Sequence, residues 1–63
     1  MTEQTAPPDI LIVEDSPVEA ELLRRTLVRA GYAVRVARNG EEGLQAARAS
    51  RPALVMSDIN MPV

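Results

Sequence analysis

The run Ile10-Leu11-Ile12-Val13 constrains the fold more strongly than any other feature, because it is short, continuous and rich in β-branched residues. Such a run is typical of a strand that is buried on both faces, as strands are in a parallel sheet. Parallel neighbours need crossover connections, which are usually helices. The rest of the chain should therefore alternate helices with strands.

A first helix is predicted directly after this strand. Ser16 is a cap residue, Pro17 suits the first turn, and Glu19 stands at the capping-box position. The helix should run to Ala30 and end at Gly31. Its expected buried stripe consists of Val18, Ala20, Leu22, Leu23, Leu27 and Ala30. Its expected solvent face includes Glu21 and Arg25, whose four-residue spacing favours an ion pair.

The remainder of the chain continues the alternation. Residues 32–37 alternate around Val34 and Val36, which predicts an edge strand. Asn39 and Glu42 then open a second helix that reaches about residue 49, with a small inner face of Gly40, Gly43, Leu44 and Ala47. Residues 53–57 form a third apolar run. The sequence therefore predicts an α/β fold, with parallel strands joined by two right-handed crossovers.

Composition excludes several classes of protein. The chain has no cysteine and no histidine, so disulfide scaffolds, Cys/His zinc sites and Ser-His-Asp triads are ruled out. A net charge of −2 and a single aromatic residue argue against direct nucleic-acid binding. No apolar run approaches the roughly 18 residues of a membrane span. Residues 1–8 are polar and proline-ended, which predicts a disordered lead-in without a secretory signal, and so a cytoplasmic protein.

Three acidic residues stand where predicted strands end. Glu14 and Asp15 follow the first strand, and Asp58 follows the third. Ligands of open α/β sheets bind at the carboxyl ends of strands, so a strand order of 2-1-3 would gather these carboxylates in one crevice. A divalent cation would relieve their repulsion, and oxygen ligands suit Mg²⁺. A carboxylate beside that ion can attack phosphorus and form an acyl phosphate. Taken singly, Asp15 and Asp58 are better explained as helix-entry and turn residues, and only the three acidic residues together favour a metal and phosphate site.

Four segments carry a recognisable combination of motifs: residues 10–16 (ILIVEDS), 30–32 (AGY), 37–44 (ARNGEEGL) and 57–62 (SDINMP). Together they resemble the first half of a two-component response-regulator receiver domain. The resemblance covers residues 9–63 and implies a flavodoxin-like fold, of which this chain supplies β-α-β-α-β in the order 2-1-3. The expected domain is therefore the N-terminal half of a five-stranded receiver, truncated after its third strand.

The resemblance also implies roles for individual residues. Asp58 would accept a phosphoryl group from a sensor histidine kinase or a phosphotransfer protein. The implied Mg²⁺ ligands are Glu14, Asp15, Asp58 and the backbone carbonyl of Asn60. Met61 and Pro62 would shape the following loop. The chain would act as a regulatory domain with at most slow self-phosphorylation and dephosphorylation, and not as a dedicated enzyme.

Two alternatives remain open. The family's phosphate-contacting Ser/Thr and Lys are absent, and the chain has no lysine at all. This favours a degenerate or half receiver that binds proteins without being phosphorylated. An exposed third-strand edge would leave the isolated chain partly unfolded, oligomeric or dependent on a complementary segment. A phosphohydrolase similar to the haloacid dehalogenase group is weaker, because Asn60 stands where that chemistry needs a general acid.

Overall fold

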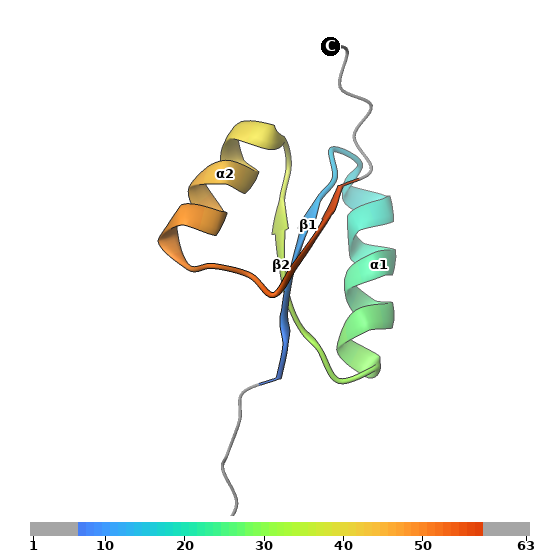
Figure 1. The fold of residues 1–63 in the computed structure, drawn as a ribbon. Helices are drawn as coiled ribbons and strands as arrows, with labels where there is room; N and C mark the ends of the chain where they lie inside the picture. The colour runs from blue at the N-terminus through green and yellow to red at the C-terminus, as the bar shows by residue number, and fades with distance from the viewer. Residues whose placement is uncertain (1–6, 58–63) are drawn as a thin grey trace, which may run out of the picture.

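The computed structural model describes residues 7–57, and these form three parallel strands and two helices in strict alternation. The elements are β1 (Asp9–Val13), α1 (Pro17–Arg29), β2 (Ala33–Ala37), α2 (Gly40–Ala49) and β3 (Leu54–Ser57). The strand order is β2-β1-β3, and the two helices lie on opposite faces of the sheet (Figure 1). The predicted α/β class and the order 2-1-3 are confirmed. Neither helix in this part of the chain is long and apolar enough to cross a membrane.

The central strand β1 is buried on both faces, as its sequence predicts. Its inner residues Leu11 and Ile12 are almost fully buried. The register pairs Leu11 with Arg35 of β2 and with Val55 of β3. Leu11 and Val13 form the core on the α2 face together with Ala37. Both other strands therefore take their register from β1, and α2 packs against it.

The capping of α1 differs from the prediction in one respect. Ser16 is the N-cap, and its Oγ accepts a hydrogen bond from the Glu19 N–H at 3.3 Å. Glu19 does not return the bond to Ser16 as a capping box requires. Instead, the Ser16 N–H donates to Oε2 of Glu14 at 3.1 Å. The helix ends at Arg29, one residue before the predicted Ala30, and the predicted stop Gly31 follows with a φ of 102° that favours glycine.

The buried stripe of α1 is narrower than predicted. Ala20 is buried, and Leu23 and Leu27 are partly buried. Val18 and Leu22 are 70% and 59% exposed, so their assignment to the stripe is wrong. A helix turns about 100° per residue, which places both side chains about 160° from Ala20 and therefore on the outer side of the helix. The predicted burial of Ala30 is also wrong, since it is the exposed C-cap.

The small inner face of α2 allows this helix to lie close to β1. A Cβ added at Gly43 would lie 2.9 Å from Cγ2 of Val13, which is too close for two carbons. Ala46 and Ala47 pack against the same core. Leu44 lies on the predicted inner face, where it lines a hollow of about 270 Å³ with Leu11 and Val55, but it is 53% exposed. A narrow face of glycine and alanine thus sets the distance between helix and sheet.

Arg35 connects three elements at the amino-terminal edge of the sheet. Its Nη2 lies 2.7 Å from Oδ2 of Asp9, and its Nε donates to Oδ1 of the same carboxylate at 3.3 Å. The guanidinium also donates to the carbonyl of Ala46 at 3.0 Å and to that of Ser50 at 2.6 Å. It therefore joins β1 to β2 and satisfies carbonyls at the end of α2.

The third strand leaves its outer edge without a strand partner among residues 7–57. Leu54 and Val55 on this strand are 53% and 49% exposed. The expected exposure of apolar surface at this edge is thus present in the described part of the chain. Its predicted consequence for association stays a prediction.

Replacing Arg35 by Met should lower the free energy of unfolding by about 1–2 kcal/mol. The change removes a two-point ion pair and two charge-assisted hydrogen bonds to carbonyls, in a partly exposed setting that reduces their net value. Urea unfolding followed by circular dichroism measures the effect. Arg48→Met is the matched control, because Arg48 is an exposed arginine in the last turn of α2. Equal midpoints for the two variants would contradict this role of Arg35.

Candidate functional site

The carboxyl-terminal edge of the sheet carries the candidate site. Glu14 and Asp15 follow the end of β1 directly, as predicted. Glu14 is only 4% exposed, whereas Asp15 is exposed. Both line a pocket of about 620 Å³. The other residues that line this pocket come from α1, β2 and the start of α2: Pro17, Ala20, Glu21, Arg24, Val36, Arg38 and Glu42.

Glu14 is fixed at two points, and one of its carboxylate oxygens has no partner in the described part of the chain. Its backbone N–H donates to the carbonyl of Ala37 at 2.9 Å, which ties it to the end of β2. Its Oε2 accepts the Ser16 N–H. Its Oε1 is buried and has no hydrogen-bond partner among the described residues. A buried carboxylate oxygen without a partner costs free energy, so this atom is suited to binding a cation or a proton donor.

Two of the three predicted carboxylates are placed by the structure. Asp58 lies outside the described residues, as do Asn60, Met61 and Pro62. The last described residue, Ser57, pairs with Val13, the residue that precedes Glu14. Within residues 7–57 there is no group of three acidic side chains that could hold a metal ion. The described part of the site is therefore the Glu14–Asp15 pair.

Sequence reasoning missed the contribution of the β2–α2 junction. Arg38 and Glu42 both line the pocket, although no acidic residue directly follows β2. Oε1 of Glu42 accepts the Arg38 N–H at 3.0 Å, and Oδ1 of Asn39 accepts the Glu42 N–H at 2.8 Å. The capping pattern Asn39-x-x-Glu42 could have indicated this contribution. A capping glutamate lies at the start of its helix, and therefore close to the end of the preceding strand.

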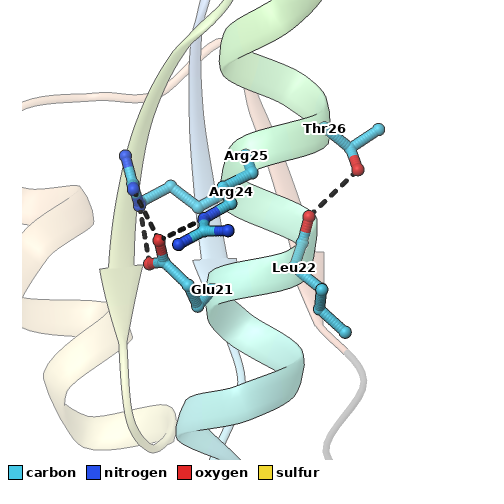
Figure 2. Close-up of polar contacts among 5 residues, drawn as sticks. All are labelled: Glu21, Leu22, Arg24, Arg25 and Thr26. Carbon is cyan, nitrogen blue, oxygen red and sulfur yellow. Dashed lines mark hydrogen bonds and ion pairs between the residues drawn. The ribbon is translucent and has the colours of Figure 1, made fainter.

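Glu21 of α1 lines the same pocket. Its carboxylate is bound by two arginines of the same helix (Figure 2). Oε2 of Glu21 lies 2.7 Å from Nη2 of Arg24 and 3.0 Å from Nε of Arg25. The pair with Arg25 confirms the prediction from spacing, and the bond to Arg24 is additional. Hydrogen bonds from Arg24 and Arg25 lower the pKa of Glu21 to about 2. Glu21 therefore stays ionised, and its charge is already matched by side chains of its own helix.

Glu21 should make the folded state acid-sensitive in a defined range. Its pKa is lowered from 4.5 to about 2 in the folded chain, so its stabilisation is complete above pH 4.5 and is lost as the pH falls toward 2. Glu21→Gln should flatten this part of the stability–pH curve, measured by urea unfolding at low salt. The effect should shrink in 1 M salt, because the ion pairs are exposed. Glu19→Gln serves as the control, and a curve equally flattened by both changes would contradict the assignment.

The fold, together with Glu14 and Asp15 at the carboxyl-terminal edge of the sheet, indicates a class of protein. Helices cover both faces of a parallel sheet, and charged side chains gather at the carboxyl end of its central strand, where doubly wound α/β domains bind their ligands. The sequence matches the response regulator receiver domain over residues 10–63. The chain therefore belongs to the response-regulator receiver family, and the structure has the strand order of a partial receiver fold.

Several curated bacterial proteins are similar to this chain. The polar-differentiation response regulator DivK of Brucella anthropi is 39% identical over 56 residues, which is 89% of this chain and 46% of DivK. Protein PilH of Pseudomonas aeruginosa is 45% identical over 53 residues, or 84% of this chain and 44% of PilH. The alkaline phosphatase synthesis transcriptional regulatory protein PhoP of Bacillus subtilis is 40% identical over 53 residues, 84% of this chain and 22% of PhoP. The chain spans less than half the length of these relatives.

Proposed function

We propose that the chain is the phospho-acceptor part of a response regulator in two-component signalling. Asp58 accepts a phosphoryl group from a sensor histidine kinase or a phosphotransfer protein. The proposed Mg²⁺ ligands are Glu14, Asp15, Asp58 and the backbone carbonyl of Asn60. The role is regulatory, with at most slow self-phosphorylation and dephosphorylation, and its setting is the cytoplasm.

The observation that carries this proposal is the buried Oε1 of Glu14, which has no hydrogen-bond partner within residues 7–57. Glu14 stands directly after the central strand and lines a pocket that Asp15 also lines. The neighbouring strand β3 ends at Ser57, and Asp58 is the next residue in the sequence. A carboxylate oxygen that is already desolvated and held in place is a favourable ligand for a hard cation. The donor set therefore fits Mg²⁺, which prefers oxygen ligands.

The proposed reaction transfers one phosphoryl group between two proteins. A carboxylate oxygen of Asp58 forms a bond to phosphorus as the N–P bond of the donor's phosphohistidine breaks, and the nitrogen keeps the electron pair of that bond. The products are an acyl phosphate on Asp58 and a neutral imidazole once the ring balances its proton with solvent. When bound, Mg²⁺ offsets negative charge on the transferring group. Glu14 and Asp15 act by binding and orienting the cation.

A second candidate function rests on β3. Its exposed Leu54 and Val55, on an edge with no strand partner among the described residues, favour a module that binds a second copy or a complementary segment without being phosphorylated. Beryllofluoride with Mg²⁺, which mimics the aspartyl phosphate, separates the two. An adduct supports the phospho-acceptor, and its absence at saturating reagent supports the interaction module.

Asp58→Asn should abolish acceptor chemistry. The amide of asparagine is a poor nucleophile toward phosphorus, so the variant should take up less than about a hundredth of the phosphate accepted by the unaltered chain. The measurement uses a radiolabelled phosphohistidine protein as donor and counts label on the chain. Glu41→Gln, which removes one exposed charge from the first turn of α2, is the control. Undiminished labelling of Asp58→Asn would identify a different acceptor.

The double change Glu14→Gln with Asp15→Asn should weaken Mg²⁺ binding at least about tenfold. It removes two anionic oxygen ligands while it keeps the shape of both side chains. Isothermal titration with MgCl₂ measures the affinity. The double variant Glu19→Gln with Glu41→Gln removes the same total charge from exposed positions that do not line the pocket. If both double variants bind Mg²⁺ equally well, the site does not lie at the end of β1.

A further inference from the structure

The two carboxylate oxygens of Glu14 have different surroundings, although they belong to one side chain. Oε2 accepts the backbone N–H of Ser16 at 3.1 Å. Oε1 is buried, unpartnered among residues 7–57, and part of a side chain that lines the pocket. The residue as a whole is 4% exposed. One oxygen is therefore hydrogen-bonded to the start of α1, and the other has no hydrogen-bond partner among residues 7–57.

We infer that the backbone N–H of Ser16 is a positioning group for cation binding, because it holds Oε2 of Glu14 and so offers Oε1 alone to a divalent cation. This inference deepens the proposed function and rests on its cation site. It assigns monodentate binding to Glu14. It also means that the N-cap residue of α1 orients the side chain of Glu14 toward the cation.

Two hydrogen bonds that hold Glu14 in place support the positioning role of the Ser16 N–H. The bond from its N–H to the carbonyl of Ala37 fixes the main chain against β2. The bond from Ser16 fixes the far end of the side chain, so little freedom remains between the two points. Groups that hydrogen-bond to a metal ligand generally control its orientation, and their loss costs about 10–100-fold in metal affinity.

The unusual capping of α1 explains why the Ser16 N–H is available for this role. Glu19 stands where a capping box would supply the acceptor, yet Ser16 donates to Glu14 instead. The Oγ of Ser16 still caps the helix through the Glu19 N–H. The cap and the positioning bond therefore use different atoms of Ser16, and substitutions can separate them.

Monodentate binding has a consequence for ion selectivity. Mg²⁺ requires a nearly ideal octahedron of single oxygen atoms, whereas Ca²⁺ also accepts bidentate carboxylates. A glutamate with one oxygen tied down suits Mg²⁺. A glutamate released from Ser16 can turn both oxygens toward the ion, which favours Ca²⁺ relative to Mg²⁺.

The test compares Ser16→Pro with Ser16→Ala in the full chain. Both variants lose the hydroxyl cap, but only proline also removes the N–H. The φ of −92° at Ser16 lies close to the range of proline, and proline does not disturb the helix interior from this position. Titration calorimetry with MgCl₂ and with CaCl₂ should show at least tenfold weaker Mg²⁺ binding for Ser16→Pro than for Ser16→Ala. The Mg²⁺/Ca²⁺ affinity ratio should fall in the proline variant only, a change that a simple loss of helix would not produce.

Glu14→Gln provides an independent test that leaves Ser16 intact. The glutamine carbonyl can still accept the Ser16 N–H, so hydrogen exchange at this amide should stay within about twofold of the unaltered chain. The amide NH₂ then takes the place of Oε1 and cannot act as a cation ligand, so Mg²⁺ affinity should fall at least tenfold. Retained Mg²⁺ affinity in this variant would overturn the inference even if Ser16→Pro failed to fold.

The outcomes separate this inference from the proposed function. If the unaltered chain binds Mg²⁺ and the two Ser16 variants bind it equally, the positioning role of Ser16 is wrong and the cation site stands. If the unaltered chain does not bind Mg²⁺, the cation site of the proposed function fails, and this inference fails with it.

Discussion

Burial of β1 on both faces is the constraint on which the rest of the structure depends. Leu11 and Ile12 point to opposite sides of the sheet, and each needs apolar cover. Crossovers in opposite directions supply it, with α1 on one face and α2 on the other. The same arrangement leaves the end of β1 between two neighbouring strands. The position of Glu14 is thus a consequence of how the strand before it is buried.

The sequence predicts this much of the fold because the signals are local. The apolar run at residues 10–13 and the caps at Ser16 and Asn39 each indicate an element within a few residues of where it forms. The errors concern relations between elements. Val18 and Leu22 are apolar but lie on the outer side of α1. Apolar character alone does not say which side of a helix has a neighbour.

The candidate site, like the fold, can be predicted from the sequence only in part. The position of Glu14 and Asp15 after the central strand follows from the sequence, because parallel strands end at a common edge. The different surroundings of the two Glu14 oxygens cannot be predicted from the sequence. They depend on whether the backbone N–H of Ser16 donates to the carboxylate of Glu14 or to that of Glu19. Both acceptors are glutamates at short range. Only the three-dimensional path of the turn between β1 and α1 decides between them.

The close approach of Gly43 to Val13 also has an evolutionary meaning. The two positions share one small volume, so the side chain that either can carry depends on the other. Sequences that diverge from this one should change them together, with any gain in size at 43 matched by a loss at 13. Because Val13 directly precedes Glu14, this shared volume also limits how the residues next to the site can drift over time.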